Sequence, residues 1–509
     1  MKKFTFATDQ TVDPFYLYLH LQSIVAPNHA FLLEAGRADD SALYQMSLVG
    51  LCPVVEVQIK DGLVAVFANS ALENLFETMQ NRIQQDAQAA LVWTSAVSDE
   101  PFLFRPEDPM AFLESIRQIL KETCAREMEQ PFSAGFLGYA GFDAVHYLER
   151  LPKTTEDDRA LPDVRLAWHA AIVQLVPGEI TLYRQDDASV FGQESDGLGK
   201  QISEVVTQLC EIARFGLGEP QLLNQCKIES SEPPEVAYDI PSDMYQHNVE
   251  KAKAYIRQGD IFQVVLSTRM RIKGAIHPYQ AYDALRKLNP SPYMFVAEYP
   301  GMRLYGASPE VQFRCIQGRA EMKPIAGTSR GRGQSEAENR RLVEALRADE
   351  KECAEHVMLV DLCRNDLGRV AVTGSVHVPD LMVVEGYSHL YHLVSRVEAV
   401  LQSDISVFHA LLATFPNGTL SGAPKIRAME IIDELEPVRR GPYGGFIGMV
   451  DADANANTAI IIRTVIEVDG TQYVQVGAGI VLDSDPEREW QECHHKAGAI
   501  LDVLTTPVV

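Results

Sequence analysis

Residues 55–67 read Val-Glu-Val-Gln-Ile-Lys-Asp-Gly-Leu-Val-Ala-Val-Phe. From Val55 to Ile59, apolar and polar side chains alternate with a period of two, which is typical of a strand with one buried face. An apolar run over 63–67 follows, and Asp-Gly between two such runs is a strong signal for a tight β-hairpin. The stretch therefore predicts antiparallel pairing of neighbouring strands.

A second hairpin and an early helix are expected on the C-terminal side of this stretch. Pro177-Gly178 separates the apolar runs 171–176 and 180–183, which predicts another tight turn. Residues 108–127 begin with Asp-Pro and then place apolar side chains at helical intervals. Strands and helices continue in mixed order, without a regular strand–helix–strand repeat. This order predicts an α+β fold rather than a doubly wound parallel sheet.

The composition excludes several classes of function. The 509 residues include 45 basic and 70 acidic side chains, and the formal net charge is −25. Because nucleic-acid binding requires a basic surface, this acidity argues against a nucleic-acid partner. The sequence has no apolar run of about 18 residues, so we expect no transmembrane helix and no membrane association. The eight cysteines form no Cys-x-x-Cys pair, which favours reduced thiols and a cytoplasmic location.

One segment has the composition of a linker. Residues 217–241 contain several glycines and prolines and few large apolar side chains. We therefore predict an N-terminal regulatory or supporting region over 1–216, a linker over 217–241 and a catalytic region over 242–509, with sheets that can interleave between the two regions. Gly- and Pro-rich motifs concentrate between 301 and 500, where we expect the chemistry.

Two predicted helices carry paired carboxylates. Glu352 and Glu355 stand three residues apart, as do Glu489 and Glu492, and this spacing places each pair on one helical face. Carboxylate oxygens suit a hard divalent cation, most simply Mg²⁺ shared with an oxyanion of a substrate. The alternative is that each pair belongs to a solvated helix face.

Glycines and basic residues occur together near the C-terminus. Residues 418–425 do not have the spacing of a phosphate-binding loop, and Gly477-Ala478-Gly479 lacks the third glycine of a dinucleotide fingerprint. These glycines instead favour close approach of backbone N–H groups to a small oxyanion. Arg463 lies in an apolar run, 459–465, that we expect to be a strand. A charge buried there needs a partner, either an anionic substrate or a structural ion pair.

Seven segments, in order, resemble the chorismate-utilising enzymes, and among them the large subunits of anthranilate synthases. Together they extend over about 240–505, and an N-terminal Phe-Leu-Leu-Glu at 31–34 matches more weakly. The segments are GDIFQVVLS (259–267), GASPE (306–310), PIAGT (324–328), EHVMLVDLCRNDLG (355–368), YSHLYHLVSR (387–396), GTLSGAPK (418–425) and GAGIVLDS (477–484).

The resemblance implies a fold and a set of site residues. The fold would be a sandwich of mixed or antiparallel sheets with helices outside. Mg²⁺ would bind Glu355 and Glu492, with Glu352 and Glu489 supporting through water, and would hold the ring carboxylate of chorismate. Glu310 would protonate the leaving C4 hydroxyl, and His392 would assist the loss of pyruvate. Thr419 would hold the ring. The carboxylates of the substrate would be bound by Gly327, Thr328, Tyr443, Arg463, Lys496 and the backbone of Gly477, Ala478 and Gly479, and Lys496 would also count among the catalytic residues with Glu310, His392 and Thr419.

Ala326 selects among the reactions of the resembled family. Relatives that form aminodeoxychorismate usually carry Lys in the Pro-Ile-x-Gly-Thr motif, and isochorismate-type relatives use a Lys to activate water. Alanine supplies no amine, which favours external ammonia adding at C2 and the formation of anthranilate and pyruvate. No glutaminase segment is visible, so a separate glutamine amidotransferase subunit is implied. The alternatives are aminodeoxychorismate synthesis, an enzyme that stops at aminodeoxyisochorismate, and a non-catalytic regulatory homologue.

The resemblance also implies an L-tryptophan effector site. It would combine Ala35, at the end of the N-terminal match, with Pro292, Tyr293 and Met294. The family usually has Ser where this chain has Ala35. Because a hydroxyl is lost, we expect inhibition that is real but weaker than with Ser.

Overall fold

The computed structural model describes most of the chain. The residues described are 1–25, 30–35, 46–68, 90–93, 101–125, 128, 130–185, 197–220, 222–223, 226, 234–329, 331–386 and 391–505.

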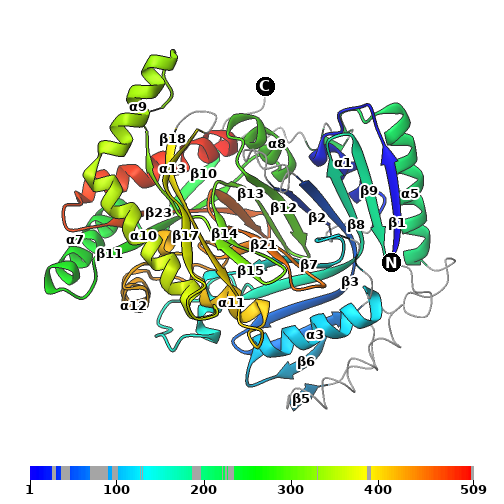
Figure 1. The fold of residues 1–509 in the computed structure, drawn as a ribbon, viewed down its shortest axis with the longest axis horizontal. Helices are drawn as coiled ribbons and strands as arrows, with labels where there is room; N and C mark the ends of the chain where they lie inside the picture. Colours follow the sequence, from blue (N-terminus) through cyan, green and yellow to red (C-terminus); the bar gives the residue numbers. More distant parts are fainter. Residues whose placement is uncertain are drawn as a thin grey trace.

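Two antiparallel sheets share one long pair of strands, β3 (Met46–Lys60) and β8 (Val164–Val176) (Figure 1). Both strands change sheet along their length. The first part of β3 pairs with β2 and its last part with β4, while β8 pairs first with β7 and then with β9. The change falls at Cys52, which has a left-handed φ of 54°, and at a register shift between Pro53 and Val55. A bulge of this kind bends a strand and so lets it enter a second sheet.

The first sheet continues from the shared pair in both directions. On one side β8 pairs with β9 (Glu179–Arg184), which pairs with β1 (Lys2–Ala7). On the other side the order is β3, β2 (Phe31–Ala35), β12 (Tyr293–Tyr299), β13 (Met302–Ser308), β22 (Thr464–Val468), β23 (Thr471–Ile480) and β11 (Gln263–Lys273), and β11 also pairs with β10 (Glu235–Tyr238) and β19 (Gly422–Ala423).

The second sheet begins at the other ends of the same two strands. From β3 it runs through β4 (Leu63–Ala68) and β6 (Phe102–Arg105) to β5 (Ala90–Trp93). From β8 it runs through β7 (Gly135–Ala140), β20 (Phe446–Asp451), β21 (Ala456–Ile460), β14 (Val311–Ile316), β15 (Arg319–Met322) and β18 (Tyr391–Val400), which also pairs with β16 (Ile325–Thr328) and β17 (His377–Gly386).

The two sheets face each other across a buried core. One cluster combines Phe295 of β12 in the first sheet with Tyr139 of β7 and Met449 of β20 in the second. All three side chains are fully buried, so each removes a large apolar surface from water. The predicted α+β sandwich of antiparallel sheets is confirmed.

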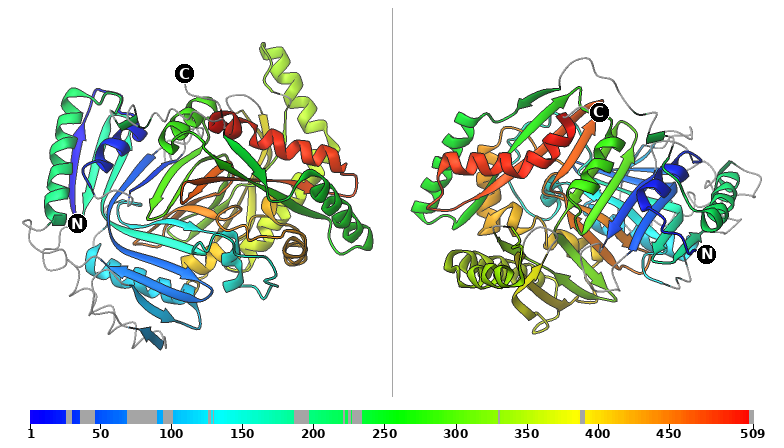
Figure 2. Two further views of the ribbon diagram at one scale, coloured as in Figure 1. Left: turned by 180° about the vertical axis from the view of Figure 1, so that it is seen from behind. Right: turned by 90° about the horizontal axis from the view of Figure 1, so that it is seen from above.

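Helices cover the outer faces of the sheets (Figures 1 and 2). The two that were expected to carry the carboxylate pairs are α10 (Glu350–Gly368) and α13 (Pro486–Thr505). Within the described ranges there are also α1 (Pro14–Gln22), α3 (Pro109–Cys124), α5 (Gly197–Phe215), α7 (Ser242–Gln258), α8 (Pro278–Leu288), α9 (Glu336–Ala348), α11 (Val407–Ala413) and α12 (Lys425–Leu435), with 3₁₀ turns η2 (Phe142–Tyr147) and η3 (Gly418–Leu420). Within the part of the chain that is described, no helix has the length and apolar character needed to cross a membrane.

Both predicted hairpins form. Asp61 and Gly62 connect β3 to β4 with φ angles of 47° and 76°, the left-handed pair that a tight hairpin turn requires. Gly178 connects β8 to β9 with a φ of 82°. The predicted helix over 108–127 is observed as α3, capped by the Asp108 side chain.

The sheets cross the boundary that composition suggested. β2 and β7, from the N-terminal half, pair with β12 and β20 from the C-terminal half. Within the predicted linker 217–241, residues 235–238 form β10 at the margin of the first sheet. Strands from both halves therefore build one framework, and the site described below rests on both.

Candidate active site

A buried carboxyl group belongs to the predicted catalytic set. Glu310 stands between β13 and β14 and is 6% exposed. The Thr419 hydroxyl, from η3, donates to both carboxyl oxygens at 3.2 and 3.3 Å. Burial raises the pKa of Glu310 to about 8, although the Thr419 hydrogen bond and the charge of Arg463 act in the opposite direction. Glu310 is therefore protonated at neutral pH, as a proton donor must be.

Arg463 approaches this carboxyl group from a break between two strands. The sequence predicted one continuous strand over 459–465, and this prediction is wrong. β21 ends at Ile460, β22 begins at Thr464, and Arg463 between them has a left-handed φ of 49°. Its guanidinium makes no hydrogen bond or ion pair with the residues described, and its attraction to Glu310 offsets part of the burial that lowers the pKa of Arg463. Such a partly buried cation without a close anion suits an anionic ligand.

Gly327 connects the predicted histidine to one of the carboxylate pairs. The Nδ1 atom of His392 lies 3.1 Å from the carbonyl oxygen of Gly327. Gly327 has a φ of 67°, and a Cβ atom there would lie 3.3 Å from Glu352 Oε2. Because a carbonyl oxygen only accepts, Nδ1 carries the ring proton. Burial lowers the pKa of His392, which keeps the ring neutral and makes Nε2 its basic nitrogen.

The two carboxylate pairs lie in the first two turns of α10 and α13. Burial and the charges of neighbouring carboxylates raise the pKa of Glu352, and among those neighbours are Glu355 and Glu492. The pKa of Glu489 is raised by burial and by the charge of Glu492. The four residues thus interact electrostatically although they come from two helices far apart in sequence. Repulsion of this kind is relieved by a bound cation.

The carboxylate donors fit Mg²⁺ in chemistry, but they do not converge in this conformation. Among the described residues, no group of three His, Cys, Asp or Glu side chains is close enough to hold an ion. Glu355 Oε1 instead accepts from Gln263 Nε2 at 3.4 Å, and Glu492 Oε1 pairs with Lys496 Nζ at 2.8 Å. Two features fit the cation. The oxygen donors are hard and repel one another, and Gly327 leaves space that a Cβ atom would take from Glu352.

The glycines of β23 lie against both of these contacts. Lys496 Nζ donates to the carbonyl oxygen of Gly477 at 2.9 Å. A Cβ on Gly477 would lie 3.0 Å from the Tyr443 hydroxyl, and a Cβ on Gly479 would lie 2.4 Å from Gln263 Nε2. The backbone carbonyl oxygen of Leu266, 2.8 Å from a Cβ on Gly477, excludes a side chain there, whereas a side chain on Gly479 would require the Gln263 amide to move.

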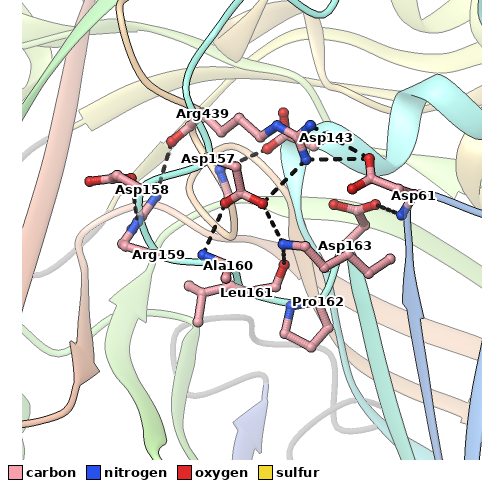
Figure 3. A network of polar contacts seen from close by, with 12 residues as sticks. Asp61, Asp143, Asp157, Asp158, Arg159, Ala160, Leu161, Pro162, Asp163 and Arg439 are labelled. Atoms are coloured by element: carbon pink, nitrogen blue, oxygen red, sulfur yellow. Dashed lines mark hydrogen bonds and ion pairs between the residues drawn. The ribbon is translucent and has the colours of Figure 1, made fainter. Parts of the chain in front are cut away.

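A polar network positions the turn that carries Tyr443 (Figure 3). Arg439 lies 3.5 Å from both Asp61 and Asp157, and Asp143 accepts the Gly441 N–H at 2.9 Å. Burial, with the charge of Asp163, raises the pKa of Asp143 to about 6. The β3–β4 turn and the connection from β7 to β8, both N-terminal in sequence, thus support a C-terminal site residue.

The structure brings most of the predicted site residues into two linked groups. The first contains Glu310, Thr419 and Arg463. The second is held together by hydrogen bonds, one ion pair, charge interactions and close packing against glycines, and its members are His392, Gly327, Glu352, Glu355, Glu489, Glu492, Lys496, Gly477, Gly479 and Tyr443. Ala478 is buried on β23, and the backbone of Thr328 pairs with His392.

The predicted effector residues lie where β2 meets β12, but Tyr293 and Met294 point to opposite faces of the sheet. β2 lies beside β12, with Ala35 opposite Tyr293 and Glu34 opposite Met294. Glu34 is fully buried and accepts from Tyr282 and Arg286 of α8, both at 3.0 Å. Neighbouring strand residues point to opposite faces, so Tyr293 points away from the face of Met294. Its hydroxyl donates to Asn457 Oδ1 at 2.9 Å. Pro292, just before β12, is partly exposed.

Two supporting residues were missed by the sequence analysis. Arg440 is 2% exposed, pairs with Glu436, and donates to the carbonyl oxygens of Leu420 and Val265 at 2.7 and 2.8 Å. It thereby fixes η3 beside β11. The other is Gln263, which lies inside the quoted GDIFQVVLS motif. That motif was the available signal, but it gives no indication that the amide reaches Glu355.

Comparison with known proteins identifies the family of this chain. The family model described as chorismate binding enzyme matches residues 77–502, so the chain belongs to the chorismate-binding enzyme family. Within that family it is similar to anthranilate synthase component 1 from Acetivibrio thermocellus, with 44% identity over 375 residues, 73% of this chain and 75% of the relative.

Two further relatives extend the similarity over nearly the whole chain. Anthranilate synthase component 1 of Geobacillus stearothermophilus is 34% identical over 501 residues, 96% of this chain and 91% of that one. The crystal structure of anthranilate synthase component I from Streptococcus pneumoniae TIGR4 superposes with a TM-score of 0.71 at 31% identity, covering 89% of this chain and 92% of that chain. The resemblance found in the sequence is confirmed.

Proposed function

We propose that this chain converts chorismate and ammonia to anthranilate and pyruvate, the first committed step of tryptophan biosynthesis. The observation that carries the proposal is the buried, protonated Glu310 between Thr419 and Arg463. The comparisons support the same reaction, because the similar proteins named above are anthranilate synthase components.

Glu310 acts in the first half of the reaction. Ammonia adds at C2 of the ring while the C4 hydroxyl leaves, and hydroxide is a poor leaving group unless it is protonated. Glu310 supplies that proton, and the oxygen leaves as water. Thr419 holds the carboxyl group through its two hydrogen bonds, and Arg463 binds a carboxylate of the substrate.

His392 acts in the second half. The C2–H bond and the C3–O bond of the amino intermediate break, which leaves the aromatic ring of anthranilate and releases the enolate of pyruvate, and this enolate takes up a proton to become pyruvate. The neutral imidazole of His392 carries its own proton on Nδ1, toward Gly327, and takes the C2 proton on Nε2.

Glu355 and Glu492 would hold Mg²⁺, with Glu352 and Glu489 supporting through water. When bound, the cation supplies Lewis-acid stabilisation of the negative charge near the ring carboxylate. Lys496, which pairs with Glu492 in this structure, would bind a carboxylate of the substrate together with Tyr443 and the backbone of Gly327, Thr328 and Gly477–Gly479.

The nucleophile comes from outside the chain. Ala326 of β16 pairs with Leu393 and supplies no amine to attack the ring. Free ammonia is scarce at neutral pH, so a separate glutamine amidotransferase subunit provides it. The eight cysteines are all free, which is in keeping with a cytoplasmic location. Tryptophan is the proposed effector, at the junction of β2 and β12.

The test is product identification. The purified chain with chorismate, Mg²⁺ and ammonium at raised pH should form anthranilate, detected by fluorescence and mass, whereas glutamine should support no turnover. An aminodeoxychorismate product, a product that retains the pyruvyl group, or no turnover would each refute the proposal. Glutamine-dependent turnover by the pure chain would refute the separate subunit.

A further inference from the structure

Gln263 has a buried atom that the site described above leaves without a role. It begins β11, is 4% exposed, and donates from Nε2 to Glu355 Oε1 at 3.4 Å. Its own carbonyl oxygen, Oε1, is buried and has no hydrogen-bond partner in the described structure. One end of the amide is therefore used and the other is not.

An unused amide oxygen in this position is costly. Burying an acceptor without a donor costs about 1–3 kcal/mol, so most buried polar groups are paired. Turning the amide over does not remove the cost, because the oxygen would then face the Glu355 carboxylate, and two acceptors would meet. The arrangement is explained if a ligand with an N–H or O–H group completes it.

The neighbouring strand makes room for this amide. In the ladder between β11 and β23, Gly479 pairs with Val265, two residues after Gln263 and hence on the same face. A Cβ atom on Gly479 would lie 2.4 Å from Gln263 Nε2, so a side chain there would force the amide to move. Glycine at 479 thus leaves the space in which the Gln263 amide points to Glu355.

We propose that Gln263 is a positioning residue for the carboxylate site. Its N–H group orients Glu355 toward the cation, and its free oxygen accepts a hydrogen bond from an N–H or O–H donor that enters with the reactants, either water on the cation or ammonia. The inference rests on the proposed function, because it takes Glu355 as a ligand of Mg²⁺. It parallels the contact of Lys496 with Glu492 beside Gly477.

The test uses Mn²⁺ as a spectroscopic substitute for Mg²⁺. Binding is followed by the electron paramagnetic resonance signal of free Mn²⁺, on the full-length chain with chorismate present and ammonia absent. Gln263→Met keeps the length of the side chain and removes both polar atoms, so the Kd for Mn²⁺ should rise about tenfold or more. Gln472→Met is the matched control, since Gln472 is also 4% exposed but contacts Tyr305 and Ile276 away from the site. Its Kd should equal that of the native chain.

A double-mutant cycle tests the contact between Gln263 and Glu355 by a second route, through a change at Gly479. Gly479→Ala should weaken Mn²⁺ binding in the native background, because the methyl group displaces the amide. In a Gln263→Ala background the same change should have little further effect. At saturating Mn²⁺, a raised KM for ammonium in Gln263→Met identifies ammonia as the donor, and an unchanged KM identifies the water.

Two results would overturn the inference, and they differ in what else they reject. If the native chain binds Mn²⁺ but Gln263→Met and Gly479→Ala both leave the Kd within twofold, the positioning role fails while the proposed function stands. If the native chain binds no Mn²⁺ under these conditions, the metal assignment in the proposed function fails together with it.

Discussion

The same side chain, glutamate, occurs in two contrasting environments in this molecule, and we propose opposite roles for it in the two. Glu310 is enclosed beside Thr419, and burial raises its pKa to about 8, so it holds its proton at neutral pH. Glu355 and Glu492 lie at the starts of two helices, beside other carboxylates and partly open to solvent. Burial suits the first to the proposed role of an acid, and crowding suits the others to the proposed cation site.

The largest expected effect tests the acid region. Glu310→Gln keeps the shape but removes the transferable proton, so kcat should fall about 10²–10⁴-fold while the Kd for Mn²⁺ stays unchanged. Glu467→Gln is the control, because burial also raises the pKa of Glu467, which is paired with Arg303 at 2.7 Å away from this site. Steady-state kinetics on both variants decides the matter, and near-native turnover of Glu310→Gln would reject the acid role.

The next effect tests the carboxylate region. Glu355→Gln or Glu492→Gln removes a charged ligand, so most activity should be lost at limiting Mg²⁺ while the fold survives. We expect a loss of about 10–100-fold that excess Mg²⁺ partly restores. Glu350→Gln, an exposed change in the first turn of the same helix as Glu355, should behave as the native chain. Titrating the rate against Mg²⁺ makes the comparison, and native behaviour of both site variants would contradict the assignment.

A smaller effect separates the two regions by pH. The rate divided by the concentration of uncharged NH₃ should fall above about pH 8, because Glu310 then ionises and no longer donates a proton. Thr419→Val removes a hydrogen bond that stabilises the ionised form, so this decline should move to higher pH by about one unit or less. Mn²⁺ affinity should instead weaken at low pH, since Glu352 and Glu489, whose pKa values are raised, then take up protons. The pH–rate profiles and Mn²⁺ titrations are the measurements. A decline that stays in place in Thr419→Val would count against the Thr419 contact.

The smallest effect lies outside both regions, at the junction of β2 and β12. Ala35→Ser restores a hydroxyl that can bind the effector, so inhibition by tryptophan should tighten by up to about tenfold, equivalent to ~1.4 kcal/mol. Inhibition curves for both proteins measure this. If tryptophan inhibits neither, the effector site is rejected, and the segment is only a core strand.

The sequence predicted the local elements well where short-range chemistry decides them. Asp61-Gly62 and Pro177-Gly178 formed the expected turns, because left-handed φ angles favour glycine and few other residues. Arg463 shows the limit of this reasoning. An apolar run predicts a strand, yet the chain breaks there so that a cation can turn toward Glu310. Periodicity reports burial, and it does not report where a buried strand ends.

The sequence by itself determined the fold class and the family, and it predicted a set of site residues, because these depend on residue types and spacings within short segments. Only the tertiary structure decided their states. The raised pKa of Glu310, the ring tautomer of His392 and the contact of Gln263 with Glu355 all depend on burial and on partners between 65 and 109 residues away. Desolvation and hydrogen bonding act between residues that are close in space but distant in sequence, so short sequence patterns do not predict them.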